Sequence, residues 1–356
     1  MTKSLRPTWI EINLKQLRKN YNELKKIQPG LKVIAVVKAN AYGHGVIEIV
    51  RTLSKEGINF FAVSSIEEAL EIRLEFTDLD ILVMGPTNPK TWDLARKNNI
   101  IITLYDEISV KEALAGEKIR VHMNVDTGMG RLGVKAKNAS QWMQALSEEE
   151  RISFEGVYTH FASSEKGDKY FRQQQLLFSK ICQDSNTPPI VHSDNTGAWT
   201  LEKSFENLHL THGRLGLGLY GYGHHFSEVK PILSWYSRVA SIKVLDAGDC
   251  VGYDHTYCSD HEEMIANLPI GYADGFLRFN QNKSVYINGN SYKIIGRISM
   301  DQTTVKIDES VKLNDKVILI GSEIDANNLA NRTNTISYEI LTNISHRVPR
   351  FYINRQ

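Results

Sequence analysis

Short apolar runs alternate with amphipathic helical stretches along the 356-residue chain up to about Tyr222. Each run has the length of a buried strand, and the stretches between them repeat apolar residues every three or four positions, as helices do. Eight such alternations predict an α/β fold, a (β/α)8 TIM barrel. The predicted strands are Val33–Val37, Phe60–Val63, Ile81–Met84, Ile100–Leu104, Val121–Val125, Phe154–Tyr158, Ile190–His192 and Leu208–Thr211. The predicted helices include Leu14–Ile27, Ile66–Glu75, Ser109–Ala115 and Phe171–Gln183.

The pattern changes after Pro231, where apolar runs follow one another without regular helices between them. Asn288-Gly289 predicts a tight hairpin, because a type I′ turn needs positive φ at both central residues. A short helix is predicted at Ile336–Ile344. We therefore expect a barrel domain over residues 1–230, whose first residues are candidates for joining the second domain, and a mostly β domain over 231–356. The predicted strands of the second domain are Val239–Leu245, Met264–Pro269, Ser284–Ile287, Tyr292–Ile295, Thr303–Ile307 and Lys316–Ile320.

The overall charge gives no reason to expect nucleic acid or an anionic membrane as a partner. The chain has 42 basic and 41 acidic residues, for a net charge of +1, which fits a small-molecule task better. The N-terminal sequence lacks the apolar core of a signal peptide, and no apolar run approaches the length of a membrane span. We therefore expect a soluble, cytoplasmic protein.

The cysteines and histidines show no spacing typical of metal sites. Cys182, Cys250 and Cys258 contain no CxxC pair, so we expect reduced thiols and neither a disulfide framework nor a thiolate metal site. No histidine lies in an HExxH helix, so we expect ordinary histidines and no catalytic metal. The closely spaced histidine pairs, which superficially resemble metal-binding pairs, are His209/His212, His224/His225 and His255/His261.

Lys38 follows five consecutive apolar residues and precedes a loop that contains Gly43 and Gly45. A strand buried on both faces would bring this amine to its carboxyl end, where catalytic side chains cluster in barrels. Desolvation disfavours the ammonium form and lowers the lysine pKa, which leaves a neutral nucleophile for Schiff-base chemistry. A strand-end lysine that extends its charge into water is the alternative.

Polar or glycine-rich motifs also follow other predicted strands. Because the carboxyl ends of barrel strands meet at one mouth, these motifs are expected to converge with Lys38. They are Asp126–Arg131, His160, Asn195-Thr196 and Arg214–Gly216.

Nine short motifs, in family order, resemble those of the alanine racemases. They are VKANAYGHG at 37–45, DTGMGRLG at 126–133, THFA at 159–162, HSDNTGA at 192–198, RLGLGLYG at 214–221, VGYDHTY at 251–257, GYADG at 271–275, GRISMDQ at 296–302 and RVPRFY at 347–352. The resemblance covers essentially the whole chain. It implies a barrel followed by a β domain, pyridoxal 5′-phosphate as cofactor, and a homodimer with shared active sites. The implied activity is racemisation of L- and D-alanine, which supplies D-alanine for peptidoglycan.

The resemblance assigns the two acid/base groups of that reaction. Lys38 would bind the cofactor covalently and act on one face of the planar carbanion, so a second group is needed on the other face. The motif position assigns this role to Tyr253, reaching the site from the partner subunit. An ordinary phenol titrates near pH 10, so such a base needs a neighbouring donor or positive charge. His160 and, beyond it, Arg214 are the matching candidates.

Arg214 would also face the pyridine nitrogen of the cofactor. An arginine donates a hydrogen bond but does not leave that nitrogen protonated as an aspartate would, so the carbanion is poorly delocalised and side reactions are limited. The resemblance implies substrate contacts from Arg131 and from the backbone N–H of Met300, the latter from the partner. The implied phosphate contacts are Tyr42, Thr196, Gly216, Leu217 and Tyr352.

Asn124 is a departure from the family pattern. Many alanine racemases carry a carbamylated lysine there, which holds the equivalent of Arg131 in place. Asparagine is neutral and cannot be carbamylated, so we expect a small anion, such as chloride, to bridge Asn124 and Arg131. The substitution also occurs in racemases of broader specificity. We further expect four residues at the channel entrance: Tyr272, Arg278, Arg297 and Asp301.

Three other functions remain open. The first is a racemase of broader specificity, acting on serine or other amino acids. The second is a pyridoxal-phosphate-dependent decarboxylase, which would usually place a carboxylate at the pyridine nitrogen, so Arg214 argues against it. The third is a non-catalytic cofactor carrier built on the barrel alone, which would leave the matched motifs around Tyr253 and Met300 unexplained.

Overall fold

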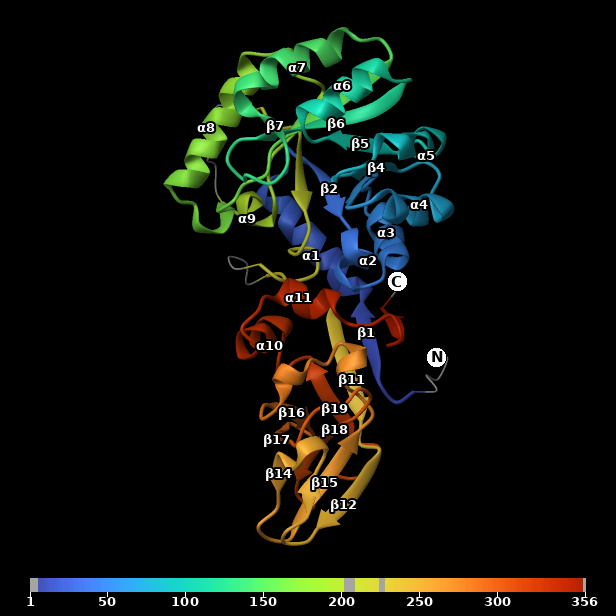
Figure 1. Cartoon of the computed structure of the whole chain (residues 1–356), viewed down its shortest axis with the longest axis vertical. Coiled ribbons are helices and arrows are strands. Elements are labelled where there is room, and N and C mark those ends of the chain that lie inside the picture. Colours follow the sequence, from blue (N-terminus) through green and yellow to red (C-terminus); the bar gives the residue numbers. More distant parts are fainter. Residues whose placement is uncertain (1–5, 202–208, 224–227, 355–356) are drawn as a thin grey trace. The chain divides into compact units, whose positions relative to one another are not determined.

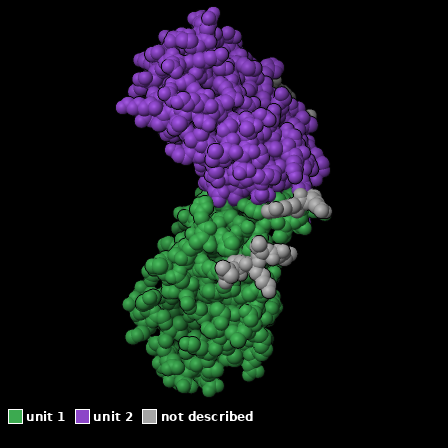
Figure 2. All heavy atoms as spheres, turned by 90° about the vertical axis from the view of Figure 1, so that its right-hand side faces the viewer, with its two compact units in different colours: residues 1–16, 42–44, 231–356 green, residues 17–41, 45–230 purple. Residues whose placement is uncertain are grey.

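The computed structural model describes residues 6–201, 209–223 and 228–354. The chain forms two compact units (Figure 2), and we describe each by itself. The barrel unit comprises residues 17–41 and 45–230, and the β-rich unit comprises residues 1–16, 42–44 and 231–356.

Eight parallel strands close the barrel (Figure 1) in the order β5-β4-β3-β2-β10-β9-β8-β6, and β6 pairs back onto β5. The predicted TIM barrel is therefore confirmed. Its strands are nearly continuous apolar runs because both faces of each strand are covered; every residue of β3 is buried. The strands are β2 (Lys32–Val36), β3 (Phe60–Val63), β4 (Asp80–Val83), β5 (Ile101–Leu104), β6 (Ile119–Asp126), β8 (Ile152–Tyr158), β9 (Ile190–His192) and β10 (His212–Leu215), and the short β7 (Val134–Lys135) pairs with β6.

Helices alternate with the barrel strands, and some of them begin at a capping side chain. Asp106 accepts a hydrogen bond from the Ser109 N–H at 2.7 Å, and Asp168 accepts one from the Phe171 N–H at 2.9 Å. The helices are α1 (Leu14–Ile27), α2 (Lys38–Tyr42), α3 (Val46–Lys55), α4 (Ile66–Glu75), α5 (Trp92–Lys97), α6 (Glu107–Ala115), α7 (Ala136–Glu148), α8 (Lys169–Gln183) and α9 (Thr196–Trp199), with single 3-10 turns at Pro89–Thr91 and Ser164–Lys166. Across the described ranges, no helix combines the length and apolarity needed to cross a bilayer.

The eighth barrel strand lies later than predicted. We expected Leu208–Thr211, of which Leu208 lies outside the described residues, but β10 is His212–Leu215 and pairs in parallel with β2 and β9. This strand is not an apolar run, because it contains Arg214. The arginine can be buried there because hydrogen bonds satisfy it. Gly213 is needed there, since a Cβ at this position would overlap the Trp199 ring.

One nine-stranded sheet forms most of the β-rich unit, in the order β12-β15-β18-β17-β16-β19-β11-β1-β20. Strand β1 pairs antiparallel with β11 and parallel with β20, so segments from both ends of the sequence lie side by side. The strands are β1 (Trp9–Asn13), β11 (Leu233–Arg238), β12 (Ser241–Leu245), β15 (Glu263–Leu268), β16 (Ser284–Ile287), β17 (Asn290–Ile295), β18 (Thr303–Ile307), β19 (Lys316–Ile320) and β20 (Arg350–Ile353).

The predicted hairpin joins β16 to β17, with φ of 52° at Asn288 and 81° at Gly289. The predicted mostly β second domain is confirmed. The remaining elements of this unit are β13 (Cys250–Val251), β14 (Tyr257–Cys258), α10 (Ala326–Arg332), α11 (Ser337–Thr342) and 3-10 turns at Tyr253–His255, Tyr272–Asp274 and Arg278–Asn280.

The prediction of reduced cysteines is wrong for two of the three. Strands β13 and β14 form a separate two-stranded sheet in which Cys250 lies directly opposite Cys258, and the pair forms a disulfide with 4.0 Å between the Cα atoms. The two cysteines meet because of the register of the two strands, and their spacing in the sequence does not indicate that register. Cys182 is a free thiol.

Candidate active site

Lys38 lies two residues beyond the end of β2 and begins a turn of left-handed backbone. Ala39, Asn40, Ala41 and Tyr42 all have φ of 52° or 53°. Consecutive L-residues rarely adopt this conformation, which costs roughly 1–2 kcal/mol per residue. Such a turn persists only where its surroundings hold it.

Glu68, from α4, holds the start of this turn. Its carboxylate accepts hydrogen bonds from the Ala39 N–H at 2.6 Å and the Ser64 N–H at 2.7 Å. The end of the turn is held by Asn40, whose Oδ1 accepts from the Val46 N–H at 2.8 Å where α3 begins. The lysine is thereby fixed between two helix starts.

Our sequence reasoning did not identify Glu68. The local signal was the Ser-x-x-Glu pattern from Ser65 to Glu68, which is typical of a capping box. Ser65 does cap α4, accepting from the Glu68 N–H. The Glu68 carboxylate, however, serves two backbone donors outside the helix, and that use is not visible in a local pattern.

Burial lowers the pKa of Lys38, and the positive charges of Arg131 and Arg214 lower it further, whereas Glu68 acts in the opposite direction. A lowered pKa increases the fraction of neutral amine at a given pH. The environment of Lys38 therefore favours its use as a nucleophile or a base.

Arg214 lies in β10 with almost no exposed surface. Its Nη1 donates to His192 Nδ1 at 2.7 Å, and its Nη2 donates to the carbonyl oxygens of Thr159 and Ser193 at 2.8 and 2.9 Å. Burial lowers its pKa to about 10, so the guanidinium stays charged at neutral pH. These contacts occupy the two terminal nitrogens and leave the Nε–H without an acceptor among the described residues.

His192 and His122 extend this network into the barrel. His192 Nε2 lies 3.0 Å from His122 Nδ1. Because an arginine only donates, His192 Nδ1 must accept from Arg214, and His192 Nε2–H then donates to His122. Burial is the main cause that lowers the pKa of His122 to about 3 and that of His192 well below its ordinary value. Both rings are therefore neutral. We had not identified either residue, although His192 opens a quoted motif.

His160 follows β8 at the same end of the barrel. Its Nδ1 lies 3.4 Å from Arg214 Nη2. Burial lowers its pKa to about 3, with further lowering from the charges of Arg214, Arg131 and Lys38. The structure thus brings four predicted site residues within electrostatic reach of one another, and the ring of His160 is neutral beside Lys38, Arg131 and Arg214.

Thr196 lies beside the turn that follows β10. Its Oγ1 accepts from the N–H groups of Gly216 and Gly218, each at 3.3 Å. The hydroxyl and the backbone of this turn, which includes Leu217, form a set of neutral donors. Hydroxyls and glycine-rich backbone turns are suited to a phosphate group.

Asn124 lies in β6, near the loop that carries Arg131. Its Nδ2 donates to the Leu132 carbonyl at 3.2 Å, while its buried Oδ1 has no partner among the described residues. Asp126 shapes the loop by accepting from the N–H groups of Gly128 and Gly130 at 2.9 and 3.0 Å. Arg131 itself is exposed in the barrel unit.

The other predicted site residues belong to the β-rich unit. Tyr253 lies in the 3-10 turn between β13 and β14 with 70% of its surface exposed. Asp254, its neighbour, pairs with Arg297 at 3.0 Å, and Asp301 pairs with Arg347. Their roles stay predictions here. The remaining residues of this set are Tyr42, Tyr272, Arg278, Met300 and Tyr352.

The donor set of the barrel unit fits pyridoxal phosphate. Lys38 supplies an amine of lowered pKa for an aldehyde, and the Arg214 Nε–H supplies a spare donor for an aromatic nitrogen. Thr196 and the turn after β10 supply donors for a phosphate. These three requirements are met by residues at the carboxyl ends of barrel strands, or just beyond them.

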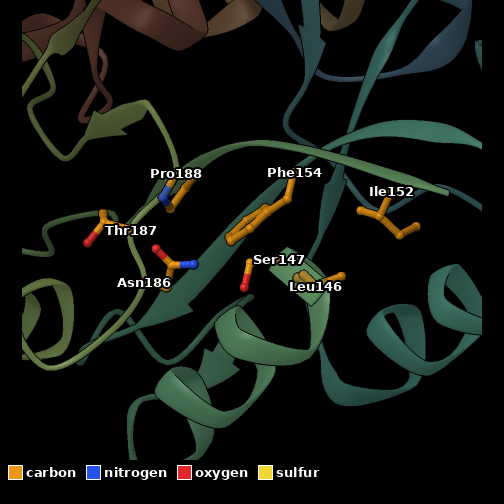
Figure 3. A pocket seen from close by; sticks show the side chains of 7 residues that line it. All are labelled: Leu146, Ser147, Ile152, Phe154, Asn186, Thr187 and Pro188. Carbon is orange, nitrogen blue, oxygen red and sulfur yellow. The ribbon is translucent and has the colours of Figure 1, made fainter. Parts of the chain in front are cut away.

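A hollow of about 190 Å³ at the opposite end of the barrel lacks this chemistry (Figure 3). It lies near the amino ends of β8 and β9, and none of its lining side chains is titratable. It is lined by Leu146, Ser147, Ile152, Phe154, Asn186, Thr187 and Pro188.

Comparisons with known proteins agree along the whole chain. The family model "Alanine racemase, N-terminal domain" matches residues 12–224, and "Alanine racemase, C-terminal domain" matches residues 232–352. The alanine racemase of Listeria monocytogenes serotype 4b (strain F2365) is 37% identical over 367 residues, covering 98% of each chain.

Solved structures show the same likeness. The alanine racemase of Bartonella henselae with covalently bound pyridoxal phosphate superposes with a TM-score of 0.90 at 28% identity, covering 98% of this chain and 99% of that one. The histidine racemase of Leuconostoc mesenteroides subsp. sake superposes with a TM-score of 0.89 at 26% identity, covering 99% of each.

Proposed function

Because this chain belongs to the alanine racemase family of pyridoxal-phosphate-dependent enzymes, we propose that it interconverts L- and D-alanine with two opposed acid/base groups. These groups are Lys38 and Tyr253 of the partner subunit. The reasoning starts from the substrate, since the α-hydrogens of the two enantiomers lie on opposite faces of Cα. One group must remove a proton from one face and another must return a proton to the other face.

Lys38 is suited to one face. A pyridoxal phosphate held by Lys38 would supply the electron sink that makes the substrate α-hydrogen acidic. The Lys38 amine has a pKa lowered by burial and by two arginines, which increases the share of neutral amine that can accept that proton. Glu68 and Asn40 hold the turn that positions it.

Tyr253 is proposed for the other face. The residue is largely exposed within its own chain, as expected of a side chain that acts in a neighbouring subunit. We therefore propose a homodimer with shared active sites. His160 and Arg214 are proposed to provide the donor and positive charge that a phenol base needs.

The contacts of Arg214 favour a racemase over a decarboxylase. Its terminal nitrogens are held by buried acceptors and its Nε–H remains available for the cofactor ring nitrogen. A charged arginine leaves that nitrogen unprotonated, so the ring is a weaker electron sink. This favours rapid return of a proton and argues against a decarboxylase, which would usually pair the ring with a carboxylate.

The remaining contacts follow from the same assignment. We propose that Arg131 and the Met300 backbone N–H bind the substrate carboxylate. Tyr42 and Tyr352 are proposed to join Thr196, Gly216 and Leu217 at the cofactor phosphate.

Asn124 favours a second candidate, a racemase with a wider substrate range. It supplies only a neutral amide near Arg131, and the group that could contact an anion is its Nδ2–H, which lies 3.2 Å from the Leu132 carbonyl. We propose that chloride supplies the missing negative charge. The fold also serves the histidine racemase mentioned above, so substrates larger than alanine fit the same architecture.

We place the reaction in the cytoplasm, with D-alanine serving peptidoglycan synthesis. A strain in which this chain is deleted is expected to need D-alanine for growth. Growth without D-alanine, in a strain with no second racemase, would contradict this role.

Exchange of the α-hydrogen tests the proposed reaction. L-alanine incubated with the purified holoenzyme in deuterated water is expected to yield D-alanine with deuterium at Cα. Release of carbon dioxide would indicate a decarboxylase instead, and neither exchange nor release would indicate a carrier. Parallel reactions with single enantiomers of serine and larger amino acids measure the substrate range.

A further inference from the structure

The disulfide between Cys250 and Cys258 closes the base of the loop that carries Tyr253. The two cysteines oppose each other in the β13–β14 pair, and Val251 opposes Tyr257 one position further along. Residues 252–256 form the rest of the loop, with Tyr253 at its start. A cross-link here limits how far the two arms of the loop can separate.

The loop has a backbone conformation that needs support. Asp254 and His255 have φ of 58° and 49°, and Gly252, at 74°, takes a conformation that a side chain would disfavour. Non-glycine residues in this region cost roughly 1–3 kcal/mol each. The observed shape therefore depends on whatever restrains the loop.

Few other interactions restrain it. Val251 and Tyr257 pack at its base against a small apolar cluster formed by Leu245, Ile265 and Ile295. Beyond that base, Asp254 pairs with Arg297 at 3.0 Å, but both side chains are partly exposed. An exposed ion pair contributes only about 0–1 kcal/mol. The disulfide is the one covalent restraint on the described loop.

Within the single chain, both sulfur-bearing residues are open to a small reductant. Cys250 and Cys258 are both exposed in the β-rich unit. Cys182 differs, because burial raises the pKa of its thiol to about 12 and keeps the reactive thiolate scarce. The cross-linked pair is thus more open to thiol chemistry than Cys182.

We propose that the Cys250–Cys258 pair is a reversible redox modification site that controls racemisation through the position of Tyr253. The inference rests on the proposed function of Tyr253. Reduction by a dithiol breaks the S–S bond with two electrons, each cysteine sulfur takes one proton, and the dithiol leaves as a cyclic disulfide. A small-molecule disulfide restores the bond by the reverse exchange. Disulfides in a reducing compartment are usually of this labile, sensing kind.

The first test follows the bond and the loop directly. Purified holoenzyme is treated with dithiothreitol or left oxidised, its free thiols are alkylated, and its peptides are examined by mass spectrometry. Alkylation of Cys250 and Cys258 is expected only after reduction. Hydrogen–deuterium exchange of residues 251–257 is expected to increase on reduction, while the hairpin around Asn288 serves as the unchanged control.

The second test measures racemisation in both directions in the same two samples. Reduction is expected to lower kcat about tenfold, because misplacing a reacting group by about 1 Å has effects of this order or larger. The double variant Cys250→Ser/Cys258→Ser is expected to have the kcat of the reduced enzyme, and dithiothreitol is expected not to change it. Cys182→Ser is the matched control and is expected to respond as the unmodified chain does.

The outcomes separate the two proposals. Equal kcat values in both states, with the bond shown to be open in one, would overturn control by this pair and leave racemisation intact. Alkylation of both cysteines without reduction, even after treatment with a disulfide oxidant, would overturn the bond itself. Absence of racemisation in both states would instead contradict the proposed function.

Discussion

The Lys38 loop and the Tyr253 loop use the same backbone device in opposite surroundings. In each, the proposed acid/base residue is followed by residues in left-handed conformation: four after Lys38 and two after Tyr253. The first loop is largely buried and is held by the Glu68 carboxylate and the Asn40 side chain. The second is largely exposed. Its base is held by a disulfide, by apolar packing and by the hydrogen bond from Tyr257 to Glu263, and the rest of the loop has one ion pair.

This difference shows that the two loops can position their acid/base residues by different interactions. In the Lys38 loop two side chains give three hydrogen bonds to the backbone, of which those of Glu68 are exposed and that of Asn40 is partly buried. An exposed loop gains little from hydrogen bonds or ion pairs, so a covalent restraint has the larger effect. Each loop should therefore respond to a different perturbation.

Replacing Lys38 by alanine should have the largest effect. The variant is expected to lose all measurable racemisation and the visible absorbance of the covalently bound cofactor, because no other amine replaces Lys38. Absorbance spectroscopy and α-hydrogen exchange measure the two losses. Lys32→Ala, at the exposed start of β2, is the control and is expected to keep both properties. Persistence of the visible band in Lys38→Ala would refute the anchor assignment.

Tyr253→Phe should have the next largest effect. The variant is expected to retain the cofactor and to lose about 10²–10⁴-fold in proton removal from one enantiomer, as for other acid/base residues. Exchange of the α-hydrogen in the other enantiomer is expected to suffer less. Tyr236→Phe, in β11, serves as the control. Equal losses for both enantiomers would argue against a face-specific role.

Acid should destabilise the Lys38 loop more than the Tyr253 loop. Burial lowers the pKa of His122 and His160 to about 3, whereas the unfolded chain binds these protons near pH 6.5. The two histidines then make their full contribution to the free energy of unfolding above pH 6.5. This contribution falls as the pH drops toward 3, by up to a few kcal/mol for each histidine. Burial raises the pKa of Asp194 to about 7, so this residue acts in the opposite direction between about pH 4 and pH 7.

Hydrogen–deuterium exchange at pH 7 and pH 5 measures this effect at both loops. Exchange in residues 38–45, corrected for the intrinsic rate, is expected to rise relative to that in residues 250–258. Asp194→Asn is expected to steepen the loss of stability, because it removes the opposing contribution. The exposed His209→Gln variant is the control. An equal change at the two loops would show that the buried histidines do not distinguish them.

Glu68→Gln should have a smaller effect on catalysis. The amide keeps one acceptor oxygen but places an NH₂ group against a backbone donor, so kcat is expected to fall about tenfold as the turn loosens. Loss of the negative charge also lowers the pKa of Lys38 further, because Glu68 is the group that raises it. Capture of cofactor by the apoenzyme should therefore extend to lower pH.

The neighbouring Glu67→Gln variant controls for the change of charge on α4, since Glu67 is exposed. It is expected to leave kcat and the pH dependence of cofactor capture unchanged. If both variants behave alike, the carboxylate of Glu68 has no specific role in the Lys38 loop.

Much of the fold could be predicted because its signals are local. Seven barrel strands and the Asn288 hairpin are encoded by apolar runs or by turn residues that act within a few positions. Strand β10 was not predicted because it contains a buried arginine, made compatible with burial by the Thr159 carbonyl just after β8 and by His192 on β9. No local pattern carries that information.

The candidate site divides in the same way. Lys38 could be identified from its place after a buried strand, and the motifs indicated its companions. Glu68 and the Cys250–Cys258 disulfide could not, because each acts through residues brought together by strand register or by helix packing. His122 and His192 were missed since a neutral, buried histidine resembles any other core residue in sequence.

The pairing of β1 with β20 has a consequence for synthesis of the chain. On the ribosome, β1 is made before any barrel strand and β20 after all of them, so the nine-stranded sheet cannot be completed until the barrel has been translated. Domains generally fold as units while the chain emerges. A nascent chain that stalls before Arg350 therefore exposes one edge of β1, and such an unpaired edge invites aggregation or proteolysis.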